Sequence, residues 1–348
     1  MQRLFRSVLV GVVTSLSTVT GAQATSTSTS TTTTPVTAST TTPTTIHVRR
    51  HPPVPVAPLT GRPDPARTTH RRSAITVKID NTPEARPQYG VENADVVYEE
   101  IVEGGITRLA AIFNSRLPRK VGPVRSVRRT DREIVYPVRG IFAFSGGAAY
   151  ALRSIASAPV KRFDQTNAGS AMFRDPRRYA PHNLYVNLVK LEAMGGKPQP
   201  PRPLFSYARP DARPVGGRVA SFTVGFAAGY ATSYQWNGAT RSWARSIFGH
   251  PDVTAGGRRV SPTNVVVMNV YYKGGVGVEG SAAQLTGSGP VTVFTAGRVV
   301  HGRWSRRRLE LPIVYRSSSG QLIRVRPGQT WVELLALSEH VSVVPARP

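Results

Sequence analysis

Two kinds of hydrophobic pattern divide the chain. Up to about residue 196, short strand-like runs are interspersed with segments of helical spacing, whereas beyond residue 217 the apolar runs have the period of two that is typical of strands. The first half is predicted to form strands at 74–80, 94–102, 106–113 and 141–144, a helix beginning at Thr130, and helices over 148–156 and 184–194.

Turn and capping residues mark the ends of some of these elements. Gly104-Gly105 fits a two-residue hairpin turn between the second and third strands. Thr130, followed by Glu133 three positions later, has the spacing of a capping box and predicts a helix N-terminus.

The second half carries a pattern of strands and tight turns. Strands are predicted at 220–224, 264–272, 291–295, 299–304, 322–325 and 330–335, with turns at Asn237-Gly238, Gly256-Gly257 and Ala296-Gly297. The stretch 197–217 holds six prolines and two glycines and predicts a connection between two domains.

The predicted fold class is therefore α+β. A mixed α/β N-terminal domain over residues 58–200 is followed by a proline-rich linker at 201–217 and a β-rich C-terminal domain at 218–342. We expect the two domains to fold independently.

The N-terminus has the pattern of an export signal. Arg3 and Arg6 precede an apolar run at 8–19 and the small-residue sequence Ala22-Gln23-Ala24, which together predict a signal peptide over residues 1–24. The alternative is a membrane anchor, although the apolar run is shorter than the roughly 20 residues needed to span a bilayer.

Residues 25–57 are rich in Thr, Ser and Pro and carry almost no large apolar side chains. Such a segment buries too little surface to offset chain entropy, which predicts a disordered stalk. Signal and stalk together predict an extracytoplasmic protein, secreted or held in the cell envelope near the membrane.

The composition narrows the chemistry. The formal net charge is +26, from 45 Lys and Arg against 19 Asp and Glu, and only six of the basic residues are Lys. Either a genome that favours Arg codons or an anionic partner explains this excess. For an exported protein the available anions are wall polymers and lipid headgroups, and nucleic acid is not expected. The absence of Cys excludes disulfides, thiol nucleophiles, Cys-bound metals and lipid attachment at Cys.

The acidic start of the stretch 94–132 offers a metal site as one of three interpretations. On a strand, Asp95, Glu99 and Glu103 share one face, and three neighbouring carboxylates require cations. An internal ion-pair network with the following arginines, a ligand site that uses some of these groups, and a Mg²⁺ or Ca²⁺ site all satisfy this requirement. No cofactor is identified by the residues alone.

The basic end of the same stretch predicts an anion site. Arg125, Ser126, Arg128 and Arg129 lie just before or at the start of a predicted helix, where free backbone N–H groups favour an anion, and Arg108 lies on the preceding strand. A solvated basic turn is the alternative.

Two further segments are candidates for ligand binding. Ser145-Gly146-Gly147 follows a predicted strand and precedes a helix, an arrangement that can hold phosphate or serve as an ordinary turn. His182-Asn183 lies in a proline-bounded loop, where the histidine can act as an acid or base or be structural.

Motifs spread over residues 58–340 carry a family resemblance. They are PLTGRP at 58–63, KIDNTPEARPQYG at 78–90, ADVVYE at 94–99, VEGGITR at 102–108, VGPVRSVR at 121–128, SGG at 145–147, APHNLY at 180–185, SPTNVVV at 261–267, LTGSGPVTVF at 285–294, GRW at 302–304 and PGQTWVEL at 327–334.

With these motifs the chain resembles the YerB-like family of secreted bacterial proteins, a two-part domain of unknown function. The resemblance implies an envelope protein on the outer side of the membrane and no established activity. Many members are lipoproteins, and this chain departs from them because it has no Cys to carry a lipid.

Three functions are compatible with the residues. The first is binding of an anionic envelope ligand, a wall polymer or phospho-lipid headgroup, at the arginine-rich site. The second is a metal-assisted enzyme acting on phosphorylated envelope substrates. The third is a protein-interaction module in an envelope assembly. The sequence leaves open whether the protein is an enzyme.

Overall fold

The computed structural model describes residues 54–347, which belong to one compact unit. The predicted signal peptide and residues 25–53 of the predicted stalk lie outside the described residues. The last stalk residues were wrongly assigned, because Ala57 is buried and its backbone N–H donates to the carbonyl of Arg62.

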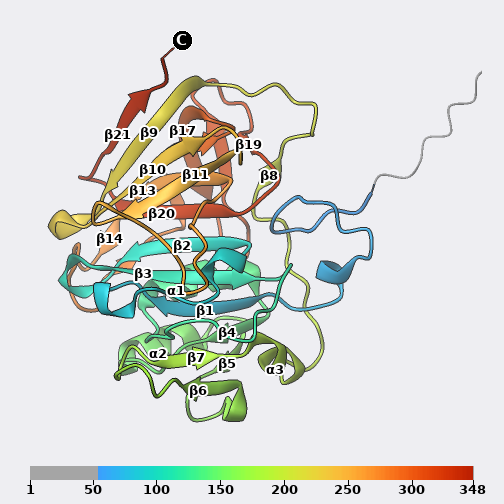
Figure 1. The fold of residues 1–348 in the computed structure, drawn as a ribbon, viewed down its shortest axis with the longest axis vertical. Coiled ribbons are helices and arrows are strands. Elements are labelled where there is room, and N and C mark those ends of the chain that lie inside the picture. Colours follow the sequence, from blue (N-terminus) through green and yellow to red (C-terminus); the bar gives the residue numbers. More distant parts are fainter. Residues whose placement is uncertain (1–53, 348) are drawn as a thin grey trace, which may run out of the picture. The chain divides into compact units, whose positions relative to one another are not determined.

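The N-terminal half forms one end of a large mixed sheet (Figure 1). Its strands are β1 (Ile75–Asp80), β2 (Val96–Ile101), β3 (Thr107–Phe113), β4 (Ile141–Ala143) and β5 (Lys161–Phe163). β3 lies between β1 and β2 and is antiparallel to both, whereas β1, β4 and β5 are parallel.

Three helices and a small hairpin accompany these strands. The helices are α1 (Arg129–Val138), α2 (Ala149–Ala156) and α3 (Leu188–Ala193), and the hairpin pairs β6 (Met172–Arg174) with β7 (Leu184–Val186). One face of α1 carries Ile134, Val135 and Val138, which are buried, so helical spacing of apolar residues positions this helix.

The C-terminal half is built almost entirely of strands. They are β8 (Ser206–Tyr207), β9 (Gly217–Gly225), β10 (Ala231–Asn237), β11 (Ser242–Ile247), β12 (His250–Pro251), β13 (Asn264–Val270), β14 (Tyr272–Lys273), β15 (Ala282–Ala283), β16 (Gly287–Thr295), β17 (Arg298–Arg306), β18 (Val314–Ser317), β19 (Arg324–Val325), β20 (Thr330–Ala336) and β21 (Val341–Pro345). The α+β prediction, with a β-rich C-terminal half, is confirmed.

The two halves share one sheet, in the order β12-β11-β10-β9-β17-β16-β13-β20-β2-β3-β1-β4-β5. The junction is the parallel pair β2 and β20, in which Glu99 lies opposite Glu333. The main hydrophobic cluster also takes residues from both halves. The expectation of two independently folding domains was therefore wrong, because neither half closes its sheet or its core without the other.

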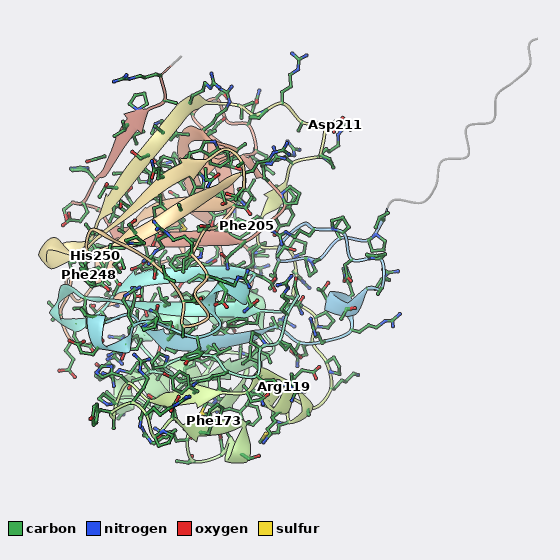
Figure 2. The ribbon with its side chains drawn as sticks, viewed as in Figure 1. Arg119, Phe173, Phe205, Asp211, Phe248 and His250 are labelled. Atoms are coloured by element: carbon green, nitrogen blue, oxygen red, sulfur yellow. The ribbon has the colours of Figure 1, made fainter. Side chains whose placement is uncertain are left out.

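The segment predicted to be a free linker is only partly free. Leu204 and Phe205 are buried, and β8 pairs with β19, whereas Asp211 lies on an exposed loop (Figure 2). Apolar side chains at 204–205 fix the first part of the segment, so the exposed connection narrows to residues 209–216.

Local differences from the predicted elements have simple causes. The chain reverses between β2 and β3 through a 3₁₀ turn at Glu103–Gly105 and not through a two-residue loop, with Gly104 at a φ of 73°. Helix α1 begins at Arg129, and Asp131 caps it in place of Glu133, since a carboxylate of Asp131 accepts the N–H of Arg128 at 2.6 Å. The predicted helix at 184–194 begins as β7 and becomes helical only at Leu188.

Among the helices that the structure describes, none combines the length and apolar character needed to cross a membrane.

Candidate functional site

The largest group of buried charges lies where β2 meets β20, and we call it the central network. It consists of Glu99, Glu333, Tyr234, Arg245, Asp252 and Arg86. Arg245 is fully buried, donates to Glu99 at 2.6 Å and also pairs with Asp252. Burial and the neighbouring charge of Glu99 raise the pKa of Glu333 well above its usual value, so Glu333 keeps its proton while the Tyr234 hydroxyl donates to it.

A second buried group joins β1, β2 and α1. Lys78 donates to Asp131 at 2.8 Å and also pairs with Glu100, and all three side chains are buried. Because one cation faces two carboxylates, charge is not balanced unless a proton is held. Burial raises the pKa of Asp131 to about 6 against the attraction of Lys78.

The predicted metal site at Asp95, Glu99 and Glu103 does not form. Asp95 accepts the backbone N–H groups of Asn114 and Ser115 at 2.6 and 2.7 Å, Glu99 belongs to the central network, and Glu103 pairs with arginines. Over residues 54–347, no group of three His, Asp or Glu side chains is arranged to hold a metal ion.

The arginine cluster is the third charged group, and we define it as Arg108, Arg125 and Arg128 with the carboxylates Glu103 and Asp80. Glu103 accepts from Arg108 at 3.2 Å and from Arg128 Nε at 2.7 Å. Burial by itself would raise the pKa of Glu103, but hydrogen bonds from Arg128 and the charge of Arg108 lower it to about 2. This carboxylate is therefore ionised at neutral pH.

Arg108 is the most buried arginine of the cluster, at 4% exposure. One of its terminal nitrogens reaches the carbonyl of Ser126 at 3.3 Å, but its Nε has no hydrogen-bond partner. Burial lowers the pKa of Arg108 to about 10, and the neighbouring positive charges of Arg128 and Arg125 add to the shift. The site thus holds more positive charge than its own carboxylates neutralise.

Arg125 connects the cluster to the histidine loop. Its Nε lies 2.9 Å from Oδ2 of Asp80, which is fully buried, and the same oxygen lies 2.8 Å from Nδ1 of His182. The Arg125 and His182 side chains retain 22% and 21% of their exposure. Both side chains can therefore contact a ligand at the surface, while the buried carboxylate of Asp80 holds them in position.

The serine and glycine residues lie beside Arg125. The Ser145 N–H donates to the carbonyl of Arg125 at 2.9 Å, and the Ser126 and Ser145 hydroxyl oxygens are 3.5 Å apart. The Val127 N–H donates to the carbonyl of Gly146 at 3.0 Å, and a Cβ at Gly147 would lie only 2.6 Å from Cγ1 of Val127. Glycine at 147 is thus explained by close packing against Val127, without a ligand.

A chain of hydrogen bonds ties the histidine loop to the same turn. Arg174 donates to Asn183 and to Gln165, both at 2.6 Å, and Gln165 donates to the carbonyl of Ser145 at 2.7 Å. The structure therefore brings together Arg108, Arg125, Ser126, Arg128, Ser145, Gly146, Gly147, His182 and Asn183, all of which were candidates in the sequence.

Arg129 is the predicted residue that lies apart from this group. Its guanidinium donates to the carbonyl of Gly280 at 3.2 Å in an exposed position. The helix N-terminus itself is also not open to an anion in the way the sequence suggested, because Asp131 already accepts the Arg128 N–H. The sequence analysis did not identify Asp80 or Arg174 as site residues. Of the two, only Asp80 has a recognisable sequence position, because it ends a predicted strand.

Two family models match this chain. One, described as "Protein of unknown function (DUF3048) N-terminal domain", matches residues 59–199, and its C-terminal counterpart matches residues 222–332. Together they cover more than half of the chain, which therefore belongs to the DUF3048 family.

A relative and a solved structure agree with this assignment. The chain is 28% identical over 298 residues to the putative lipoprotein YerB of Bacillus subtilis, covering 82% of this chain and 88% of the relative. It also superimposes on the crystal structure of the YerB protein from the same organism with a TM-score of 0.72 at 24% identity, covering 82% of this chain and 99% of that one. The structural likeness confirms the fold.

Proposed function

We propose that this member of the DUF3048 family is an extracytoplasmic envelope protein that binds an anionic ligand, a wall polymer or phospho-lipid headgroup, at the arginine cluster. The name of its relative, a putative lipoprotein, supports the location. The observation that carries the ligand class is the surplus of arginine: Arg108, Arg125 and Arg128 face only two carboxylates.

Two arginines of the cluster have a donor group without a hydrogen-bond partner. The Nε of buried Arg108 has no partner, and the geometry of the Arg125 Nε contact with Asp80 is not that of a hydrogen bond. A buried donor without an acceptor costs free energy, so a bound phosphate or carboxylate oxygen would relieve it. The hydroxyls of Ser126 and Ser145 add neutral donors beside the arginines.

The test is calorimetric titration of the full-length chain with inorganic pyrophosphate and with a polyphosphate. Arg125→Ala is expected to weaken binding by roughly 1.5–3 kcal/mol, the scale of hydrogen bonds to a charged group. Arg129→Ala removes the same charge from an exposed position outside the cluster and is the matched control, expected to change affinity by about 1 kcal/mol or less. Affinity should also fall with added salt.

Arg125→Lys separates recognition from scaffolding, because lysine keeps a positive charge near Asp80 but lacks the guanidinium fork. Reduced affinity at an unchanged melting temperature supports the proposal. If Arg125→Ala lowers the melting temperature while pyrophosphate affinity stays that of the wild type, the arginines are scaffold and the proposal fails.

A second candidate, turnover of a phosphorylated envelope substrate, is favoured by the contact between Asp80 and His182. A buried carboxylate that holds Nδ1 orients the imidazole so that Nε2 is available for proton transfer. Release of phosphate from a phosphate ester that is abolished in His182→Ala, with pyrophosphate affinity retained, would favour this candidate over binding alone.

A further inference from the structure

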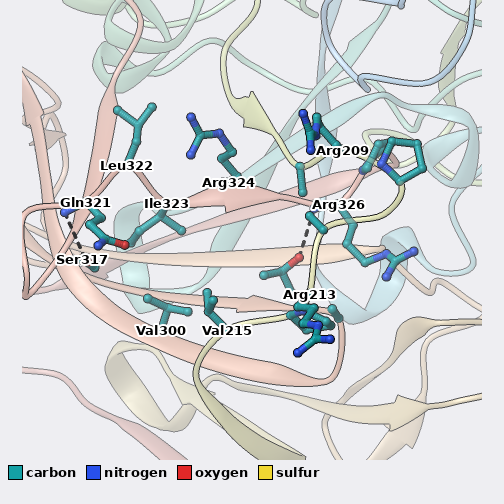
Figure 3. A pocket seen from close by; sticks show the side chains of 17 residues that line it. Arg209, Arg213, Val215, Val300, Ser317, Gln321, Leu322, Ile323, Arg324 and Arg326 are labelled. Atoms are coloured by element: carbon teal, nitrogen blue, oxygen red, sulfur yellow. Dashed lines mark hydrogen bonds between the residues drawn. The ribbon is translucent and has the colours of Figure 1, made fainter. Parts of the chain in front are cut away.

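A second basic site lies in the C-terminal half, in a groove of about 240 Å³. One wall consists of residues from 208–215, most of which belong to the exposed connection, and the other comes from residues 295–300 and 317–327 (Figure 3). This groove shares no residue with the arginine cluster.

The lining of the groove combines apolar side chains with positively charged arginines. The large apolar side chains of the lining are Val215, Val300, Leu322 and Ile323. Four arginines also line the groove, and no acidic residue does; they are Arg209, Arg213, Arg324 and Arg326.

The arginines are largely unneutralised. Arg209 pairs with Asp211 at 3.4 Å in an exposed contact, and within residues 54–347 the other three form no ion pair. Figure 3 shows Val300 and Ile323 toward one side of the groove and Arg209, Arg213 and Arg326 toward the other. Arg324 lies beside Leu322 and Ile323, so three of the four arginines gather on one side and the apolar side carries the fourth.

We propose that this groove binds an amphiphilic anion, with a hydrocarbon chain on the valine and isoleucine side and a phosphate or carboxylate head between the arginines. Burial of a hydrocarbon chain supplies affinity, and arginine forks match both kinds of head. The volume is below the roughly 300–1,000 Å³ of sites that enclose a whole small molecule, so the groove takes one segment of a chain with its head at the rim.

Charge and geometry argue against two other occupants. Residues 1–53, which precede the described part of the chain, contain no Asp or Glu and cannot neutralise the arginines. An extended peptide presents alternating side chains, whereas three of the four arginines of the groove gather on one side of it.

The probes are n-decyl phosphate and decanoate below their micelle concentrations, titrated into the full-length chain. Inorganic phosphate tests the head alone, and decyltrimethylammonium tests the same tail with the opposite charge. Binding of either anionic amphiphile, with both controls weaker by about tenfold or more, supports the proposal.

Two variants locate the binding. Val215 is 67% exposed, so Val215→Asp introduces a charge into the apolar lining without disturbing a buried contact, and Arg213→Glu reverses a charge in the basic lining. Each should weaken decyl phosphate by about tenfold. Arg307→Glu, at an exposed arginine that does not line the groove, is the matched control and should have little effect.

Because decyl phosphate could also meet the arginine cluster, binding is repeated in Arg125→Ala, which should leave the groove affinity unchanged. Equal binding of the cationic amphiphile, or loss of decyl phosphate binding in Arg125→Ala but not in Val215→Asp, would overturn the proposal. So would an acidic peptide that binds at the groove when neither amphiphile does.

Discussion

The central network and the arginine cluster take one carboxylate each from β2 and the turn that follows it, Glu99 and Glu103, but the balance of charge in the two groups is opposite. In the central network Arg245 and Arg86 face Glu99 and Asp252, and Glu333 remains protonated, so charges cancel. In the arginine cluster three arginines face two carboxylates, which leaves one positive charge in excess.

The central network and the arginine cluster also differ in how far their side chains are exposed. The side chains of Glu99 and Arg245 are fully buried, whereas Arg125 and His182 each keep about a fifth of their surface open. A closed, neutral network has no use for a ligand and serves to position strands. An open group with surplus cations has the properties of a binding site. An arginine-rich motif therefore indicates a binding site only where the carboxylates around it are too few to neutralise its charge.

The largest effect we expect is from Arg245→Met in the central network. Removing this cation leaves Glu99 and Asp252 buried with one partner fewer, and breaking a buried ion pair from one side costs about 3–5 kcal/mol. The free energy of unfolding, measured with urea, should fall by this amount.

The matched variant for that measurement is Arg129→Met, which removes the same group from the surface, where a change of about 1 kcal/mol or less is expected. Similar losses in both variants would remove the distinction between a structural network and surface charge.

A smaller effect, dependent on pH, is expected from Glu333→Gln. Burial and the charge of Glu99 raise the pKa of Glu333, so the folded state keeps a proton that the unfolded state releases above pH 4.5. The contribution of Glu333 to the free energy of unfolding must then fall as pH rises. Glutamine cannot ionise, so the stability of Glu333→Gln relative to the wild type should increase from pH 5 to pH 7.

Glu99→Gln should behave differently, because it deletes the charge that faces Arg245 and lowers stability at pH 7. Urea unfolding of both variants at pH 5 and pH 7 provides the measurement. A stability difference for Glu333→Gln that is independent of pH would mean that Glu333 is ionised in the folded protein.

The sequence predicted much of the fold and most of the residues that the proposed site brings together, but not which charges meet. Period-two patterning located β1, β2, β3, β13 and β20 because their apolar positions repeat locally. It did not predict β10, whose sequence ATSYQWN holds few large apolar residues.

Long-range pairing explains the errors at the site. Arg245, the partner of Glu99, lies 146 positions away, so a search among nearby residues offered Glu99 the arginines that follow it, a ligand or a metal, and not its actual partner. The candidates from Arg108 to Asn183 could be grouped because family motifs and local charge marked them, whereas Arg174 carries no such signal.

The smallest effect is expected from cutting the chain between its halves, and it tests whether the central network holds them together. The longest exposed stretch between 201 and 217 begins at residue 209, so limited proteolysis should cut within 209–216 and spare 204–207, where Leu204 and Phe205 are buried. Since β2 pairs with β20 and Arg245 reaches Glu99, the two fragments should stay associated in native size-exclusion chromatography and separate only in denaturant. The arginine cluster lies wholly on the N-terminal fragment, so pyrophosphate affinity should be unchanged in the nicked protein. Fragments that separate under native conditions would show that the shared sheet and the central network contribute little to the association of the two halves. The central network could then no longer be called the structural counterpart of the arginine cluster.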